Sequence, residues 1–118
     1  MFTAIVQDHV VNPRNTGALE NATHHGVAGV PGEGPYMLMW FEVTEGTIVR
    51  ASYDTYGCPS AIASGSVSAE ILQGRTISQA LLLDATDIQR LLGGLPAGKE
   101  HCAQLVVDTI RDAFQTFL

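Results

Sequence analysis

The sequence predicts an α+β fold in which a β-hairpin lies between helices. Residues 2–10 place apolar side chains at helical spacing, residues 36–55 form two strand-like segments around a turn, and helical spacing returns after Pro59. This order argues against repeated βαβ units and therefore against a Rossmann-type fold. The sequence also contains no phosphate-binding loop of the GxxxxGK[ST] type.

The composition indicates one folded domain over residues 1–118, since 46% of the residues are hydrophobic and only 15% are charged. No apolar run approaches the roughly 20 residues that span a bilayer. The first 11 residues lack the basic flank and apolar block of a signal peptide, so we expect a cytoplasmic protein. The net charge of −6 predicts neither a nucleic-acid partner nor an anionic-membrane partner.

The first element is predicted to be a helix that ends at Asn12, because the residue before a proline disfavours helical geometry. Its apolar face comprises Phe2, Ile5, Val6, His9 and Val10. Residues 14–34 are rich in glycine and proline and are interpreted as a long loop with a short strand near its centre. Such loops are usually functional or mobile.

The hairpin is predicted from two segments that flank a turn at residues 44–46. Residues 36–43 are densely apolar and include Trp40 and Phe41, which favours a strand. Residues 47–55 alternate in polarity. This alternation predicts that Val49, Ala51 and Tyr53 share one face and that Ile48, Arg50, Ser52 and Asp54 share the other.

The second half of the chain is predicted to be helical. A helix that begins at Pro59 should stop near Gly74. Thr76 and Gln79 fit a capping box for a short helix over residues 77–83. Either Asp84 or Thr86 could cap the next helix, which should end near residues 93–94. The last helix should begin between residues 99 and 102 and run to the C-terminus, with Val106, Ile110, Ala113, Phe114 and Phe117 on its apolar stripe.

Two cysteines are the main candidates for chemistry, because two thiols form at most one disulfide and no disulfide framework. Pro59 favours the first helical position, which makes Cys58 the N-cap. A thiol there has a lowered pKa and suits metal binding or sulfur chemistry, although a buried packing cysteine is an equally good interpretation. His101 and Cys102 offer zinc or iron ligands, although the pair alone is better explained as a surface histidine beside a core cysteine.

Three further features are weaker candidates for a functional site. Glu33 lies in the glycine-rich turn PGEGP and is either an oxygen ligand or, taken alone, more simply a solvated charge. The His24-His25 pair in the long loop is interpreted as incidental. Lys99 is the only lysine, and it either steers an anionic group or is a solvated charge.

Four segments together resemble the IscU/NifU-type iron–sulfur cluster assembly scaffolds. They are NPRNTG at residues 12–17, TYGCPSAIAS at 55–64, GRT at 74–76 and LPAGKEHC at 95–102. They resemble the family segments NPRNxG, TYGCGSAIASSS, GKS or GKT, and LPPVKxHC. The order and spacing match from about Val6 to Ile110.

This resemblance implies a three-stranded antiparallel sheet packed against helices, with the third strand supplied by the loop before Pro31. It implies a scaffold rather than an enzyme, on which a [2Fe–2S] cluster is assembled with sulfur from a cysteine desulfurase and then passed to cluster-acceptor proteins. In many systems a J-protein and Hsp70 bind the LPPVK segment. Here Ala97 and Gly98 replace the family's Pro-Val, which puts recognition of this segment by the J-protein and Hsp70 in doubt.

The resemblance also identifies an altered site. The family uses three cysteines, and Glu33 stands where the first is expected, with Pro35 in place of the nearby aspartate. Glu33, Cys58, His101 and Cys102 remain as four potential ligands for a [2Fe–2S] cluster, for iron or for zinc. Pro59 replaces a family glycine.

Three functions follow from this ligand set. The first is a cluster scaffold or carrier. The second is a zinc-binding sulfur relay in which Cys102 accepts persulfide sulfur. The third is an interaction module that keeps the fold and has lost the chemistry. We adopt the first as the prediction.

Overall fold

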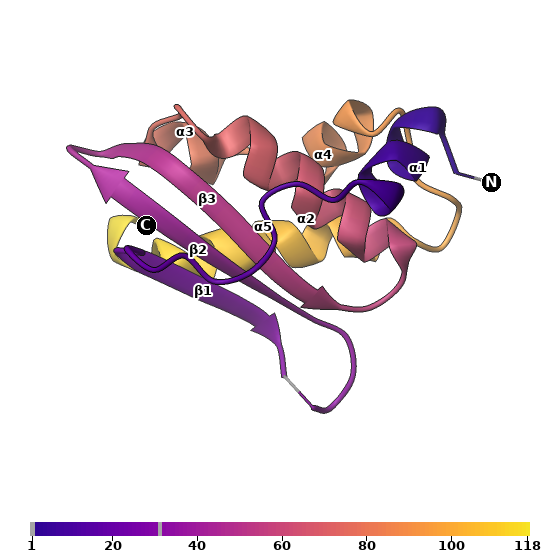
Figure 1. Cartoon of the computed structure of the whole chain (residues 1–118), viewed down its shortest axis with the longest axis horizontal. Coiled ribbons are helices and arrows are strands. Elements are labelled where there is room, and N and C mark those ends of the chain that lie inside the picture. Colours follow the sequence, from indigo (N-terminus) through magenta and orange to yellow (C-terminus); the bar gives the residue numbers. More distant parts are fainter. Residues whose placement is uncertain (1, 31) are drawn as a thin grey trace.

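The structure is a computed structural model that describes residues 2–30 and 32–118 (Figure 1). The elements are α1 (Ala4–Val11), β1 (His24–Gly29), β2 (Tyr36–Thr44), β3 (Thr47–Tyr56), α2 (Pro59–Leu72), α3 (Ile77–Leu82), α4 (Ala85–Leu91), α5 (His101–Ala113) and a final 3₁₀ turn (Gln115–Phe117). The predicted α+β fold is therefore confirmed. Within the described residues, no helix combines the length and apolarity needed to cross a bilayer.

The three strands form one antiparallel sheet in the order β1-β2-β3. The long glycine-rich segment supplies β1, as the family resemblance implied. Gly29 pairs with Tyr36, and Tyr36 pairs with Tyr56, so the end of β1, the start of β2 and the end of β3 meet at one end of the sheet. The β1–β2 loop and the β3–α2 connection leave the sheet from this same end (Figure 1).

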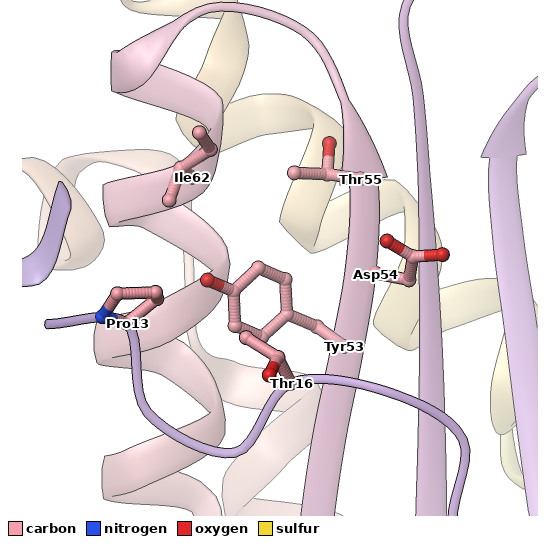
Figure 2. A pocket seen from close by; sticks show the side chains of 6 residues that line it. All are labelled: Pro13, Thr16, Tyr53, Asp54, Thr55 and Ile62. Atoms are coloured by element: carbon pink, nitrogen blue, oxygen red, sulfur yellow. The ribbon is translucent and has the colours of Figure 1, made fainter. Parts of the chain in front are cut away.

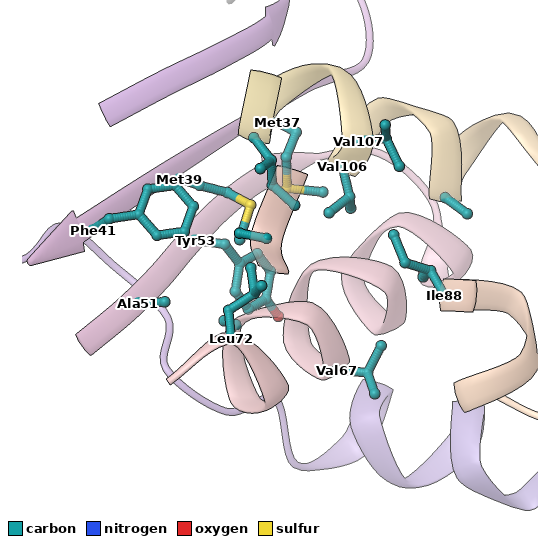
Figure 3. Packing of buried hydrophobic residues seen from close by; sticks show 14 of the residues in the cluster. Met37, Met39, Phe41, Ala51, Tyr53, Val67, Leu72, Ile88, Val106 and Val107 are labelled. Carbon is teal, nitrogen blue, oxygen red and sulfur yellow. The ribbon is translucent and has the colours of Figure 1, made fainter. Parts of the chain in front are cut away.

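Helices α2 and α5 cover one face of the sheet, with α2 against β3 and α5 against β1 and β2. The core lies between these layers (Figure 3). The sheet contributes Met37, Met39, Phe41, Ala51 and Tyr53, and the helices contribute Val67, Leu72, Ile88, Val106 and Val107. Because burying an aliphatic or aromatic side chain of this size stabilises a fold by about 1.5–3 kcal/mol, this layer supplies most of the driving force for folding.

Two glycines allow the helices to approach the sheet closely. A Cβ atom on Gly65 of α2 would lie 2.4 Å from Cδ2 of Tyr53, and one on Gly26 of β1 would lie 2.2 Å from the carbonyl oxygen of Thr109. Both distances are far below van der Waals contact. These positions therefore need glycine for space and not for an unusual backbone angle.

The predicted alternation in β3 is wrong at its start. The register shifts between Glu42 and Val43, so that Val43 pairs with Ile48 and Val49 is the extra residue of a β-bulge. The bulge turns Val49 outward, where 42% of its surface is exposed, and places Ile48 in the core with no exposed surface. A bulge reverses the alternation of all residues before it, which a strict two-residue period cannot predict.

The helix boundaries agree with the predicted caps, with one difference at the C-terminus. Asp84, and not Thr86, caps α4, and its side chain accepts a hydrogen bond from the backbone N–H of Asp87. The last α-helix ends at Ala113 instead of continuing to the chain end. Phe114 leaves the helix and places its ring between His24 and Phe41, with ring centroids 5.2 and 4.8 Å away.

Candidate functional site

Cys58 lies at the corner between β3 and α2, where the sequence predicted it. It is the N-cap of α2, and Pro59 occupies the first turn. The carbonyl oxygen of Cys58 accepts hydrogen bonds from the N–H groups of Ala61 and Ile62, which fixes the corner. Its side chain makes no capping hydrogen bond to the helix and is half-buried.

His101 and Cys102 open α5, directly after the turn that contains Lys99. The carbonyl oxygen of Lys99 accepts a hydrogen bond from the N–H of Cys102, and the carboxylate of Glu100 accepts one from the N–H of Gly98. Cys102 is buried with 3% of its surface exposed, whereas His101 is exposed. The starts of α2 and α5 thus bring Cys58 and Cys102 next to each other.

The sulfur atoms of Cys58 and Cys102 lie 3.7 Å apart, and Nε2 of His101 also lies 3.7 Å from Sγ of Cys102. Two thiolates about 2.3 Å from one tetrahedral zinc ion stand about 3.8 Å apart, and a thiolate and an imidazole nitrogen stand about 3.6 Å apart. Tetrahedral sulfur-rich geometry also suits the iron of a cluster. Each of the two observed distances therefore fits a pair of donors on one tetrahedral metal ion.

The two thiols differ in pKa. Burial acts to raise the pKa of Cys58, but backbone N–H groups in the first turn of α2, the neighbouring thiol and the Lys99 ammonium outweigh it and lower this pKa below its ordinary value. Burial raises the pKa of Cys102 to about 12, and interaction with Cys58 adds to the increase. Cys58 is therefore the thiol that is more readily present as thiolate in the metal-free protein.

Glu33 is exposed on the β1–β2 loop, whose backbone is tied by a hydrogen bond from the N–H of Glu33 to the carbonyl oxygen of Val30. The loop lies at the same end of the sheet as Cys58. In the part of the chain that the structure describes, no three His, Cys, Asp or Glu side chains form a group that could hold a metal ion as they stand. The structure thus brings Cys58, His101 and Cys102 together pairwise, and the role of Glu33 as a ligand stays a prediction.

The other histidine pair is separated by the strand geometry. His24 and His25 are neighbours in β1, and neighbouring strand residues point to opposite faces. The ring of His24 packs against Phe114 and Phe117, with centroids 5.2 and 6.0 Å away. His25 is exposed opposite Trp40. The interpretation of this pair as incidental agrees with these positions.

A surface pocket of about 460 Å³ lies at the same end of the sheet and was not predicted from the sequence. It is lined by Gly32 and Gly34 of the β1–β2 loop and by Tyr36 and Tyr56, whose rings stack with centroids 6.2 Å apart. Tyr56 is only two residues before Cys58. The pocket therefore joins the β1–β2 loop to the end of β3, just before the cysteine corner.

A second pocket, of about 170 Å³, lies elsewhere, between the segment after α1, strand β3 and helix α2 (Figure 2). Its lining residues are Pro13, Thr16, Tyr53, Asp54, Thr55 and Ile62. The nearby segment pairs with β3, because the N–H of Tyr53 donates to the carbonyl of Asn15 and the N–H of Gly17 donates to the carbonyl of Tyr53. The NPRNTG motif thus has a structural role at the sheet edge, apart from the cysteines.

Residues 1–118 match the family described as the NifU-like N terminal domain. The chain is 38% identical over 113 residues to the iron–sulfur cluster assembly scaffold protein IscU 1 of Archaeoglobus fulgidus, covering 96% of this chain and 74% of that protein. It is 41% identical over 115 residues to the scaffold protein IscU of Aquifex aeolicus, covering 96% and 73%.

Solved structures show the same fold. A candidate iron–sulfur cluster assembly scaffold for the SUF system from Fervidobacterium islandicum superposes with a TM-score of 0.73 at 18% identity, covering 95% of both chains. The N-terminal part of a NifU-like protein from Brucella abortus gives a TM-score of 0.72 at 17% identity, covering 96% of this chain and 91% of that chain. The full-length family match and the IscU relatives confirm the resemblance seen in the motifs, and the chain belongs to the NifU-like N-terminal domain family.

Proposed function

We propose that this protein is an iron–sulfur cluster assembly scaffold whose cargo is held by Cys58, Cys102 and His101. The observation that carries the proposal is the 3.7 Å separation of the two sulfur atoms, which suits two thiolates on one tetrahedral metal ion. The IscU scaffolds of Archaeoglobus and Aquifex, at 38% and 41% identity, support the same function. The cargo is a [2Fe–2S] cluster built from iron and sulfide.

In this proposal Glu33 supplies the remaining donor from the β1–β2 loop. A carboxylate keeps the negative charge that a thiolate would bring but replaces soft sulfur with hard oxygen. Iron–sulfur clusters are held mainly by thiolates and tolerate histidine in place of some of them. We therefore expect the cluster to be more labile than one held by three cysteines and a histidine. Such lability suits a protein that receives sulfur from a cysteine desulfurase and passes the cluster to acceptor proteins.

The test is anaerobic reconstitution with iron and sulfide. We expect a visible absorption spectrum and stoichiometric iron and sulfide in the wild-type chain, and loss of both in Cys58→Ala and in Cys102→Ala. Gln104→Ala is the matched control, because Gln104 is an exposed residue of α5 whose side chain donates a hydrogen bond to Asp108, one turn further along the helix. A wild-type chain that stays colourless, without bound iron and sulfide, would contradict the proposal.

A zinc-binding sulfur relay is the second candidate, and the same geometry favours it because the sulfur separation fits a single zinc ion. It predicts about one zinc per chain in protein as purified. It also predicts stimulation of a cysteine desulfurase that disappears in Cys102→Ala. Metal analysis of the purified chain separates the two functions, since iron with sulfide supports the scaffold and zinc alone supports the relay.

A further inference from the structure

The two cysteines form a close pair with unequal access to solvent. Their sulfur atoms lie 3.7 Å apart across the contact between the starts of α2 and α5, and both are free thiols. Cys58 is half-buried at the β3–α2 corner, whereas Cys102 lies behind it with 3% of its surface exposed. The chain has two cysteines, so no third thiol competes with either.

We propose that this pair releases sulfide from a persulfide, with Cys58 as the entry point and Cys102 as the resolving thiol. This activity rests on the proposed scaffold function, because it names how the site obtains sulfide from sulfur that arrives at the oxidation level of a persulfide. In the sulfur-relay alternative, Cys102 is the sulfur acceptor. The burial of Cys102 places Cys58 nearer to an incoming donor.

The reaction balances without an added oxidant or reductant. The thiolate Sγ of Cys58 attacks the outer sulfur of the donor persulfide, the S–S bond of the donor breaks, the donor leaves as its thiolate, and Cys58 now carries Sγ–SH. The sulfur of Cys102 attacks Sγ of Cys58, the bond between Sγ and the outer sulfur breaks, and the outer sulfur leaves as hydrosulfide, which takes up the proton lost by Cys102 to give hydrogen sulfide. The outer sulfur is reduced to sulfide, while the two cysteines are oxidised to a Cys58–Cys102 disulfide. An external dithiol reductant then supplies two electrons and restores both thiols.

The geometry favours this step over simple storage of the persulfide. Thiol–disulfide exchange depends on access of the attacking sulfur to the sulfur attacked. With 3.7 Å between the two Sγ atoms, the attacking atom is already at contact distance from its target. Holding two reacting groups together makes the step intramolecular, which raises its rate over attack by a free thiol.

The experiment uses the full metal-free chain, reduced and freed of reductant, with glutathione persulfide as the probe. We expect about one sulfide per chain, disappearance of both thiols, and a chain mass lower by about 2 Da from the two lost hydrogens. Cys102→Ser should instead retain the sulfur on Cys58, gain about 32 Da, and release sulfide at least tenfold more slowly. Cys58→Ser should show neither the disulfide nor rapid release.

Gln104→Ala is the matched control and should behave as wild type. Cys102→Ala serves as a second variant should the serine disturb the core, with circular dichroism as the check on folding. A wild-type chain that keeps the added 32 Da without releasing sulfide, or single-cysteine variants that release it equally fast, would overturn the inference. Reconstitution from supplied iron and sulfide needs no persulfide. A chain that forms the cluster but releases no sulfide from a persulfide therefore contradicts the sulfide-releasing activity and leaves the scaffold function standing. A chain that releases sulfide but forms no cluster contradicts the scaffold function and leaves the sulfide-releasing activity standing.

Discussion

Glu33 places an exposed carboxylate on the β1–β2 loop, at the same end of the sheet as Cys58. Its side chain is exposed, so the loop accommodates a substitution there without disturbing the core. The neighbouring glycines at positions 32 and 34 have φ values of 89° and 121°, a region that favours glycine. The turn geometry therefore depends on the two glycines, and residue 33 can be substituted without changing it.

Glu33→Cys is expected to strengthen cluster binding, because a thiolate is a better ligand for cluster iron than a carboxylate. The measurement is the decay of visible absorbance of the reconstituted protein in the presence of an iron chelator, which should be slower in the variant. Glu20→Cys, which adds a thiol at an exposed position outside the site, is the control. Equal decay in the variant and the wild type would show that residue 33 does not reach the cluster.

Gly65 is a second position where a single substitution should change the protein, here because an added Cβ atom would reduce its stability. A Cβ there would lie 2.4, 2.8 and 3.0 Å from three ring carbons of Tyr53. Gly65→Ala should lower the free energy of unfolding by about 1–3 kcal/mol, even though alanine is the better helix former, because the ring is packed in the core and has little room to move.

Urea unfolding checks this expectation, with Ser68→Ala as the control on the same helix. Ser68 is fully buried, and its hydroxyl has no hydrogen-bond partner among the described residues. Removing that hydroxyl should leave stability unchanged or raise it. An unchanged urea midpoint in Gly65→Ala would mean that α2 can shift away from Tyr53 without cost.

At the scale of elements, the helix termini show how far local sequence rules extend. The predicted capping box at Thr76 and Gln79 is present in both directions, with the Thr76 side chain accepting from the N–H of Gln79 and the Gln79 side chain accepting from the N–H of Thr76. These contacts span three residues, so the sequence alone contains the information. The bulge at Val49 depends on how β3 pairs with β2, and the sequence of β3 alone does not contain it.

Thr76→Ala removes the side-chain half of this capping box and should destabilise the protein by about 1 kcal/mol. Thermal unfolding followed by circular dichroism measures the loss as a lower midpoint. Thr86→Ala is the matched control, because Thr86 is exposed within α4 while Asp84 provides the cap of that helix. Equal midpoints for the two variants would show that tertiary contacts alone maintain α3.

At the scale of the whole molecule, a buried histidine links the first helix to the central one. His9 of α1 is 4% exposed, and its Nδ1 lies 2.7 Å from the hydroxyl oxygen of Ser66 in α2. The same hydroxyl accepts a hydrogen bond from the backbone N–H of Arg14. Burial, assisted by the Arg14 charge, lowers the pKa of His9 below its ordinary value of 6.5.

This lowered pKa predicts a loss of stability in mild acid. Below the pKa of the unfolded chain, near 6.5, the unfolded state binds a proton that folded His9 does not, so the free energy of unfolding falls as the pH decreases toward the folded pKa. Urea titrations between about pH 7.5 and 5.5 should show this decline. His9→Gln should show a smaller decline over the same range, and an equal decline would assign the effect to other groups.

The sequence by itself determined the family, the helix caps and the positions of the two cysteines at helix starts, because each depends on short-range patterns or on motifs read in order. The tertiary structure alone decided that Cys58 and Cys102 lie 3.7 Å apart and that Tyr36 and Tyr56 line a pocket at the end of the sheet where Cys58 lies. These contacts join residues far apart in the chain, so they depend on strand register and helix packing, which no local pattern encodes.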